Sequence, residues 1–274
     1  MATASKATGK TRAKTFSLAF SGSGYLVPIH GGAACAILDK GHKIVETAGT
    51  SGGSIIAAAI ALGMTSTEIK DMALNTSFKG LLKPNIFSIF KNKAFSDGNA
   101  LLAVLQTIFG GKTMSDAVMP CSLLSTHVEA GASYEFTPAS DGNTSVSLAC
   151  RASAAVPFIY APVIYNGMTL VDGGVINNIP VDRLIAPRSI KIGVDVDEST
   201  SYSFDGLFSY ASSLIGMMLS ANENTHVALG KLTGVDILAV PTKQWFLDTD
   251  MMQSEKERLF LSGYNTMLDQ LQRY

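Results

Sequence analysis

The stretch that decides the fold is IVETAGTSGGSIIAAAIALGM, residues 44–64. Its first residues, Ile44 to Ala48, predict a strand, and the alanine-rich run from Ser54 to Met64 predicts a buried helix. Only the glycine turn at residues 49–53 separates the two. A strand that runs through a tight turn directly into a helix is typical of a parallel sheet with crossover helices.

The same order occurs once earlier, where residues 14–20 predict a strand, residues 21–24 form a glycine turn, and apolar residues then recur at helical spacing. Ser66 is the expected N-cap of a later helix, and Asn166-Gly167 predicts a tight hairpin. Further strands are expected at residues 121–128, 134–137, 163–165, 169–171, 189–196 and 235–240, and further helices at 66–75, 99–109, 145–154, 205–220 and 254–273.

Composition limits the possible classes of protein. The chain has 274 residues, of which 47% are hydrophobic and 16% charged, and its mean hydropathy is +0.25. This excludes a disordered chain or a solvated coiled coil. The net charge of −1 gives no field that would attract nucleic acid. We expect a flexible tail at residues 1–13 and a single domain at residues 14–274.

Several features bear on where the protein works. The most apolar stretch, residues 54–64, has about half of the roughly 20 residues that a membrane-spanning helix needs. The N-terminal tail lacks the apolar region of a secretory signal peptide. Cys35, Cys121 and Cys150 lie far apart, without metal-binding spacing, and are expected to be reduced thiols. We therefore expect a cytoplasmic protein.

Ser51 is the first candidate for chemistry. Gly49-Thr50-Ser51-Gly52-Gly53 fits the pattern G-x-S-x-G, in which a sharp turn between strand and helix lifts a nucleophilic serine out of the sheet. The free N–H groups at the start of the next helix can stabilise negative charge there. The pattern also fits an ordinary glycine turn, but its place between a strand and a helix favours the nucleophile.

A serine nucleophile needs a base. Among the histidines, His127 lies in an apolar strand and is the candidate, whereas His30, His42 and His226 are expected to be structural or exposed. Asp172 is the alternative, because it ends a short strand just before Gly173 and Gly174 and can there face a cleft. Asp172 can equally be a simple turn residue.

Three segments together resemble the patatin-like phospholipases. Residues 49–54 are similar to the family's nucleophile motif, and Asp172-Gly173-Gly174 to its aspartate motif. Residues 151–157, 160–162 and 177–181 resemble the block around that aspartate almost residue for residue. The resemblance covers about residues 14–197. It implies a three-layer α/β/α fold with a central, mostly parallel sheet, and a catalytic dyad of Ser51 and Asp172.

The first glycine turn departs from the family's pattern. The family has an oxyanion loop D/S-G-G-G-x-R-G, whereas residues 21–27 read SGSGYLV, with Leu26 at the arginine position. The resemblance implies an oxyanion hole of backbone N–H groups. One lost donor can lower a rate by on the order of a hundredfold, so a modest activity is expected. The expected donors are those of Gly22, Ser23, Gly24 and Gly52.

The resemblance implies a lipid acyl hydrolase of the phospholipase A or lysophospholipase type. Its substrate would be a phospholipid or lysophospholipid, cleaved through an acyl-Ser51 intermediate with Asp172 as base and with no metal or cofactor. Two alternatives stay open: an acyltransferase that uses the same dyad, and a non-catalytic lipid-binding or scaffold member of the fold.

Residues 78–95 are the candidate segment for transient contact with a membrane, because they mix lysines with large apolar side chains. The alternative is a lid packed on the core. The expected contact residues are Lys79, Lys83, Phe87, Phe90, Lys91 and Lys93. A second apolar set is expected to form core or the lining of an acyl pocket: Met217, Met218, Trp245, Phe246, Met251 and Met252.

Two further motifs give weaker indications of a binding site. Gly111-Lys112-Thr113 looks like the end of a phosphate-binding loop, but the required earlier glycine is replaced by Gln106. Asp195 and Asp197 alternate at the end of a strand and are either a metal pair or, more simply, solvated carboxylates.

Overall fold

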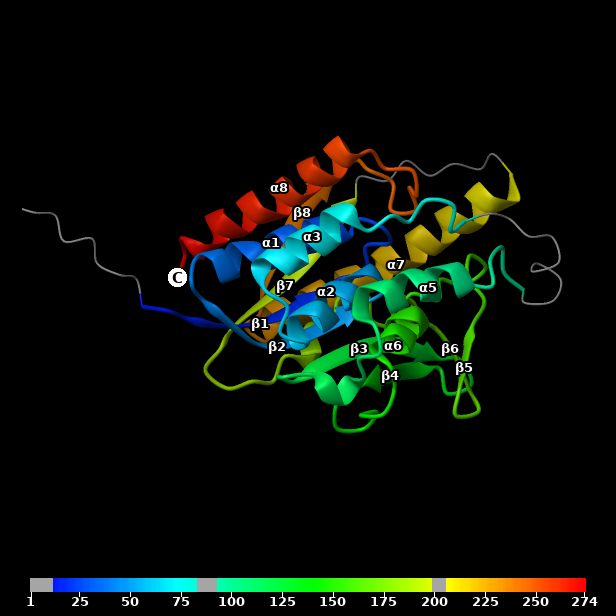
Figure 1. Cartoon of the computed structure of the whole chain (residues 1–274), viewed down its shortest axis with the longest axis horizontal. Helices are drawn as coiled ribbons and strands as arrows, with labels where there is room; N and C mark the ends of the chain where they lie inside the picture. The colour runs from blue at the N-terminus through cyan, green and yellow to red at the C-terminus, as the bar shows by residue number, and fades with distance from the viewer. Residues whose placement is uncertain (1–11, 83–92, 199–205) are drawn as a thin grey trace, which may run out of the picture.

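A computed structural model describes residues 12–82, 93–198 and 206–274 as one β-sheet flanked by helices (Figure 1). The strands are β1(Thr15–Phe20), β2(Lys43–Thr50), β3(Cys121–His127), β4(Ala132–Phe136), β5(Val163–Tyr165), β6(Met168–Asp172), β7(Ile190–Glu198) and β8(Asp236–Thr242). The α-helices are α1(Val27–Asp39), α2(Gly52–Ala61), α3(Ser66–Asn75), α5(Asn99–Phe109), α6(Val146–Ser153), α7(Leu207–Leu232) and α8(Gln253–Leu271). Short 3₁₀ helices are η1(Met114–Asp116), η2(Gly173–Val175) and η3(Val181–Arg183).

The sheet is mostly parallel, as predicted. Its strand order is β5-β6-β3-β2-β1-β7-β8, with β4 paired to β3. The strands from β3 through β2, β1 and β7 to β8 pair in parallel. The pairs β3–β4, β3–β6 and β5–β6 are antiparallel. The predicted hairpin joins β5 to β6, and both Asn166 and Gly167 have the positive φ that its tight turn requires.

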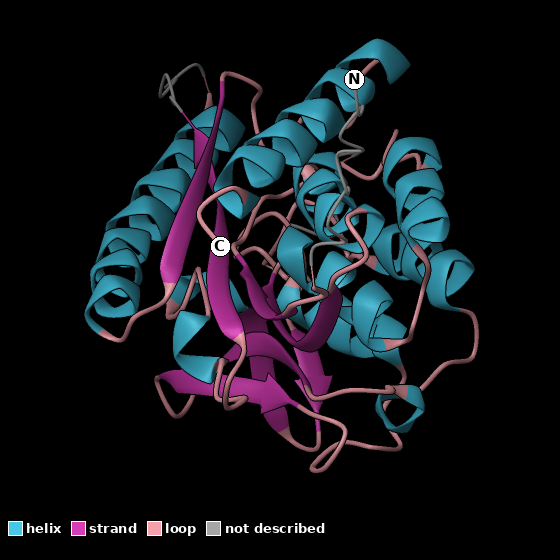
Figure 2. Ribbon diagram, turned by 90° about the vertical axis from the view of Figure 1, so that its left-hand side faces the viewer, coloured by secondary structure: helices cyan, strands magenta, loops and turns pink. Residues whose placement is uncertain are grey.

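Helices cover both faces of the sheet, which confirms the three-layer α/β/α prediction (Figure 2). Along β1, Phe16, Leu18 and Phe20 enter the large core under α1, α2 and α8, whereas Ala19 faces the opposite layer. That second core is smaller and includes Val181, from the η3 segment on which α7 packs. The side chains of β1 alternate because both faces of a central strand are buried.

Two of the helix boundaries that differ from the prediction have a clear physical cause. The N-cap of α3 is Thr65 rather than Ser66, because Thr65 and Glu68 exchange side-chain and backbone hydrogen bonds in a capping box. α7 continues to Leu232, well beyond the predicted end at residue 220. The residues after 220 are polar and so did not indicate a helix in the sequence. They have a structural role, since the side chain of Asn222 donates hydrogen bonds to the carbonyl groups of Gly174 and Val175.

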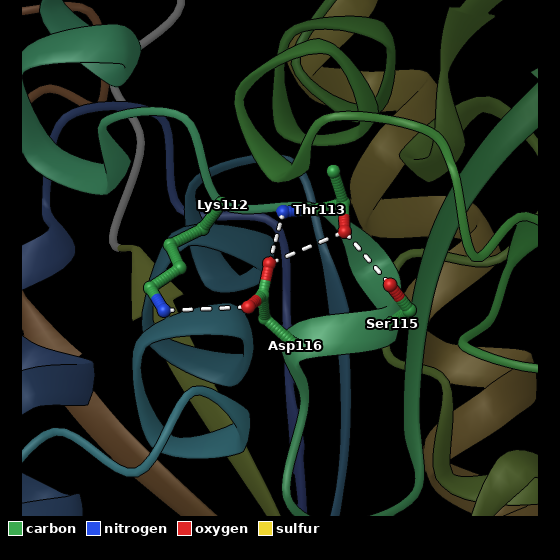
Figure 3. A network of polar contacts seen from close by, with 4 residues as sticks. All are labelled: Lys112, Thr113, Ser115 and Asp116. Atoms are coloured by element: carbon green, nitrogen blue, oxygen red, sulfur yellow. Dashed lines mark hydrogen bonds and ion pairs between the residues drawn. The ribbon is translucent and has the colours of Figure 1, made fainter.

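The turn after α5 contains Gly111-Lys112-Thr113, and its polar side chains bind one another (Figure 3). The Lys112 ammonium lies 3.3 Å from a carboxylate oxygen of Asp116. Asp116 also accepts hydrogen bonds from the Thr113 N–H, at 2.8 Å, and from its hydroxyl. These contacts start the short helix η1 and direct the lysine to a carboxylate of its own chain.

One feature of the sheet positions the candidate site. β2 and β6 lie on the same side of β3, because β4 occupies its other side. Thr50 of β2 pairs with Leu124, and Asp172 of β6 pairs with the next residue, Ser125. β2 runs parallel to β3 and β6 runs antiparallel, so their carboxyl ends meet. Ser51, which follows Thr50, is thereby brought to Asp172.

The packing of α1 against α8 generates a prediction of stability. A Cβ at Gly263 would collide with the carbonyl oxygen of Ile29, and a Cβ at Gly32 with that of Phe260. We expect Gly263→Ala to lower the free energy of unfolding by about 2 kcal/mol, because the two helices must separate. Urea unfolding measures this. Gly111→Ala is the control, since no atom lies within 4 Å of its added Cβ. Equal stability of the two variants would contradict the prediction.

Candidate active site

Ser51 sits at a strained turn between β2 and α2. Its φ of 51° and ψ of −124° are rarely adopted by a residue with a side chain. The flanking glycines permit this turn, since a Cβ at Gly49 would lie 2.6 Å from the Gly53 carbonyl oxygen. A Cβ at Gly53 would collide with the carbonyl oxygen of Ser21. Ser51 is 5% exposed and lines a cavity.

Hydrogen bonds hold the strained turn in place. The Ser51 N–H donates to the hydroxyl of Ser153 on α6, at 2.9 Å, and that hydroxyl donates to the Leu124 carbonyl of β3, at 2.5 Å. The Ser51 carbonyl accepts from the side chain and the N–H of Ser54. Sequence reasoning did not assign Ser153 a role. Its position in the block of residues 151–157, which resembles the family, was the feature of the sequence that could have indicated a role.

Asp172 is the last residue of β6 and is 1% exposed. Its Oδ1 accepts a hydrogen bond of 2.8 Å from the Gly174 N–H, and its Oδ2 has no partner among the described residues. Burial raises the pKa of Asp172 to about 6, while the nearby Ser51 side chain and the Gly174 N–H act in the opposite direction. The Ser51 hydroxyl is thus close enough to affect the carboxylate, although no hydrogen bond joins the two side chains in this geometry.

The other candidate base is engaged elsewhere. The Nε2 atom of His127 lies 3.2 Å from a carboxylate oxygen of Glu129. His127 pairs with Leu170 in the sheet, two positions along β3 from the Ser125–Asp172 pair. Of the two candidate bases, Asp172 is the one that the strand register brings to Ser51.

The four predicted oxyanion donors are not equivalent. The Gly22 N–H already donates to the carbonyl of Asn178, at 2.9 Å, which corrects the expectation that it is free. Within the described residues, no acceptor is present for the N–H groups of Ser23, Gly24 and Gly52. Ser23 also keeps a negative φ, so its serine side chain is accommodated without strain.

The oxyanion loop is held by two contacts. The Tyr25 N–H donates to the Phe246 carbonyl at 2.8 Å, and a Cβ at Gly24 would collide with that same oxygen. Leu26, at the arginine position of the motif, is fully buried in the core. Leu26 therefore packs in the core at the position where the family's motif has a charged arginine.

His30 also supports this loop. Its ring is fully buried against Phe20, and Nε2 donates to the Ser21 carbonyl at 2.9 Å. Burial lowers the pKa of His30 to about 4, so the ring is neutral at neutral pH. The sequence left His30 as either structural or exposed, and the structure shows it to be buried. The structure places that structural role at the loop beside Ser51.

Ser51 opens on two spaces of different character. A cavity of about 290 Å³ has Gly22, Ser23, Gly24 and Ser51 on one side and residues of α7 on the other. A slot of about 20 Å³ lies on the other side of Ser51 and is mainly apolar. The side chains that line this slot are those of Tyr25, Ile55, Phe78, Leu101, Val156, Tyr160 and Leu247.

The methionines and aromatic residues that were expected to form core or the lining of an acyl pocket lie in different environments. Phe246 lines the larger cavity and Met251 is buried, as expected. Met218, Trp245 and Met252 are 59%, 44% and 64% exposed, respectively, so for these three the expected burial is wrong. Met218 is exposed because α7 has only one face against the protein.

The candidate membrane segment is described only at its ends. Lys79 and Lys93 are exposed, whereas Phe78 is buried and stacks on Tyr25 at 4.9 Å between ring centroids. Lys83, Phe87, Phe90 and Lys91 lie outside the described residues. No helix in the described part of the chain has both the length and the apolar character to cross a bilayer. Among these same residues, no cluster of histidine, cysteine or carboxylate side chains is suited to a metal ion.

Comparison with known proteins gives consistent matches. A family model described as patatin-like phospholipase matches residues 18–185. An uncharacterised NTE family protein of Mycobacterium tuberculosis is 27% identical over 180 residues, which are 65% of this chain and 45% of that protein. The chain thus spans less than half the length of this relative. A probable lipid hydrolase of invertebrate iridescent virus 6 is 27% identical, over 56% of this chain and 58% of its own.

A further relative matches along nearly the whole chain. The uncharacterised protein R571 of Acanthamoeba polyphaga mimivirus is 22% identical, with 93% of each chain covered. Among solved structures, VipD from Legionella pneumophila has a TM-score of 0.59 at 12% identity, covering 96% of this chain and 67% of its own. ExoU, in its complex with SpcU from Pseudomonas aeruginosa, has a TM-score of 0.52 at 17% identity, covering 95% and 51%. These two likenesses show the fold.

The buried carboxyl of Asp172 generates a prediction about pH. Its pKa is raised from 3.8 to about 6 in the folded protein, so folding favours the protonated form. This stabilisation is present at low pH and is lost as the pH rises through 6. Relative to Asp172→Asn, the wild type should lose about 2 kcal/mol of unfolding free energy between about pH 4.5 and about pH 7.5. Urea unfolding of both proteins across this range measures the difference, and a constant difference would refute a raised pKa.

Proposed function

Because the chain belongs to the patatin-like phospholipase family, we propose that it is a lipid acyl hydrolase with Ser51 as nucleophile and Asp172 as base. The observation that carries the proposal is the end-to-end meeting of β2 and β6, which brings Ser51 to a buried carboxyl group. The G-x-S-x-G turn and the two spaces on either side of Ser51 support it. The substrate class is a phospholipid or lysophospholipid.

In the first half of the proposed reaction, Asp172 accepts the proton of the Ser51 hydroxyl while the oxygen attacks the ester carbonyl. An ordinary aspartate is a weak base, and burial makes Asp172 a stronger one by raising its pKa. The N–H groups of Ser23, Gly24 and Gly52 stabilise the negative oxygen. The ester bond then breaks, and the proton on Asp172 passes to the departing alcohol.

In the second half, Asp172 accepts a proton from water, whose oxygen attacks the acyl-Ser51 ester. The bond to Ser51 breaks, the fatty acid leaves, and the proton returns from Asp172 to the serine oxygen. Atoms and charges balance without another reactant. The slot beside Ser51 presents an apolar surface to the start of the acyl chain, and the larger cavity has room for the leaving alcohol.

The dyad can be tested by substitution. Ser51→Ala and Asp172→Asn should each lower the release of fatty acid from phosphatidylcholine vesicles by on the order of 10⁴-fold, since the nucleophile or its base is lost. His127→Ala should stay within about twofold of the wild type, because its ring faces Glu129. Covalent labelling of Ser51 by a fluorophosphonate should likewise be lost in Ser51→Ala, strongly lowered in Asp172→Asn and retained in His127→Ala. The dyad is wrong if Asp172→Asn is fully active and His127→Ala is not, and thermal melts check that each variant is folded.

We also propose that the protein binds membranes transiently through the segment of residues 78–95. The support is its sequence, in which lysines alternate with large apolar residues. Its lysines would contact anionic headgroups while Phe87 and Phe90 enter the acyl boundary.

Replacement of four lysines by glutamate should weaken co-sedimentation with anionic liposomes at least tenfold, since each basic residue near such a surface contributes about 1 kcal/mol. The positions are Lys79, Lys83, Lys91 and Lys93. A variant with the same change of net charge, made at exposed positions elsewhere, is the control: Lys40, Lys43, Lys231 and Arg273. Equal binding of the two variants would eliminate this segment as the contact.

A further inference from the structure

The larger cavity beside Ser51 has a second wall that the proposed reaction does not use. This wall is formed by α7, the end of β7 and Asn178 from the loop after η2, opposite the oxyanion loop. Its polar side chains are those of Asn178, Asp197, Ser220, Glu223 and Asn224. The wall therefore faces the space that the proposed function assigns to the leaving alcohol.

Two of these polar side chains carry carboxyl groups, and a third carboxyl group lies behind them. Glu223 lines the cavity and accepts a hydrogen bond of 2.6 Å from the Asn178 side chain. Asp195 lies behind it, 5% exposed, and close enough to share a proton with it. Burial and the neighbouring Asp195 raise the pKa of Glu223 to about 9. Burial also raises the pKa of Asp195, so the two carboxyl groups share a proton near neutral pH, and the carboxylate of exposed Asp197 lines the same cavity.

Nothing on the cavity wall balances these charges. Among the described residues that line it, none is lysine, arginine or histidine. The ion pairs of the described residues involve neither Asp195, Asp197 nor Glu223.

Two buried acceptors of this region also lack a donor. The Oδ1 atoms of Asp195 and of Asn178 have no hydrogen-bond partner among the described residues, although the two side chains are only 5% and 3% exposed. Asn178 itself lines the cavity, beside Gly22. A buried acceptor without a partner is costly, so a ligand that brings a positive charge close to these oxygen atoms is favoured here.

We propose that this wall binds the cationic amine of the lipid headgroup, so that the protein selects zwitterionic lipids with an ethanolamine or choline group over anionic lipids. This proposal rests on the proposed function for the placement of the leaving group. Asp197 and Glu223 are the selecting residues, with Asp195 behind them. An anionic headgroup would be repelled by the carboxylate charge in this partly enclosed space, whereas an amine is attracted to it.

Binding of lipid analogues that cannot be hydrolysed tests the proposal independently of catalysis. The probes are dodecylphosphocholine and dodecyl sulfate, which share a chain length and differ in headgroup charge, each below its micelle concentration. Isothermal titration of Ser51→Ala should show dodecylphosphocholine binding about tenfold more tightly. Adding Asp197→Lys to Ser51→Ala should remove this preference or reverse it, and Glu223→Lys should act in the same direction.

Asp269→Lys is the matched control, because it makes the same charge change on α8, at an exposed position that does not line the cavity. It should leave the preference within about twofold. Asp197 is exposed, so its substitution is compatible with folding even if Glu223→Lys fails to fold. The proposal is overturned if the two probes bind equally, or if Asp197→Lys and Asp269→Lys have the same effect. Hydrolysis of lysophosphatidylcholine by the wild type is measured separately, and its absence would refute the proposed function without altering the binding ratio.

Discussion

The site depends on one constraint in the sheet, which is that β2 and β6 share one side of β3 and meet end to end. A parallel strand and an antiparallel strand on the same side must point their carboxyl ends at each other. The residues that follow Thr50 and end β6 therefore converge, whatever the loops between them do. About 120 residues separate Ser51 from Asp172 along the chain, yet the register leaves a single residue step between their partners on β3, Leu124 and Ser125. A slip of one residue in either strand would turn a side chain to the opposite face.

The junction at which the two strand ends converge is crowded, and glycine occupies the positions where a side chain would not fit. At Gly53 and Gly173, a Cβ would collide with the carbonyl oxygens of Ser21 and Leu124, respectively. The positive φ of Ser51 is a strain of about 1–3 kcal/mol. It persists because Ser153 and Ser54 bind the backbone on both sides of it. Glycine in the motif is thus required by backbone contact as much as by the turn itself.

The strands and most of the helices could be predicted because their apolar runs and glycine turns are local signals. Ser51 and Asp172 could be named from motifs, but the reason that they meet is a property of register between distant segments. The full length of α7 was hidden because polar residues such as Asn222 interrupt its apolar pattern, and they are polar because they bind the loop after Asp172. The engagement of the Gly22 N–H with Asn178 is likewise a tertiary contact. A hydrogen bond between two backbone groups does not depend on the residue types, so it cannot be predicted from them.

Two acidic groups near Ser51 show how similar burial leads to different chemistry. Asp172 is isolated from other carboxyl groups on its strand end, accepts one N–H, and has its pKa raised only to about 6, so it is ionised and available as a base at neutral pH. Glu223 is less completely enclosed, but it faces Asp195, and the repulsion between two carboxylates holds a proton on the pair. A group that keeps its proton at neutral pH is a poor base, whatever its distance from the serine. For Glu223 the repulsion from Asp195 therefore adds to the effect of burial, whereas for Asp172 burial is the only effect that raises the pKa, and this difference suits Asp172 rather than Glu223 to the proposed role of base.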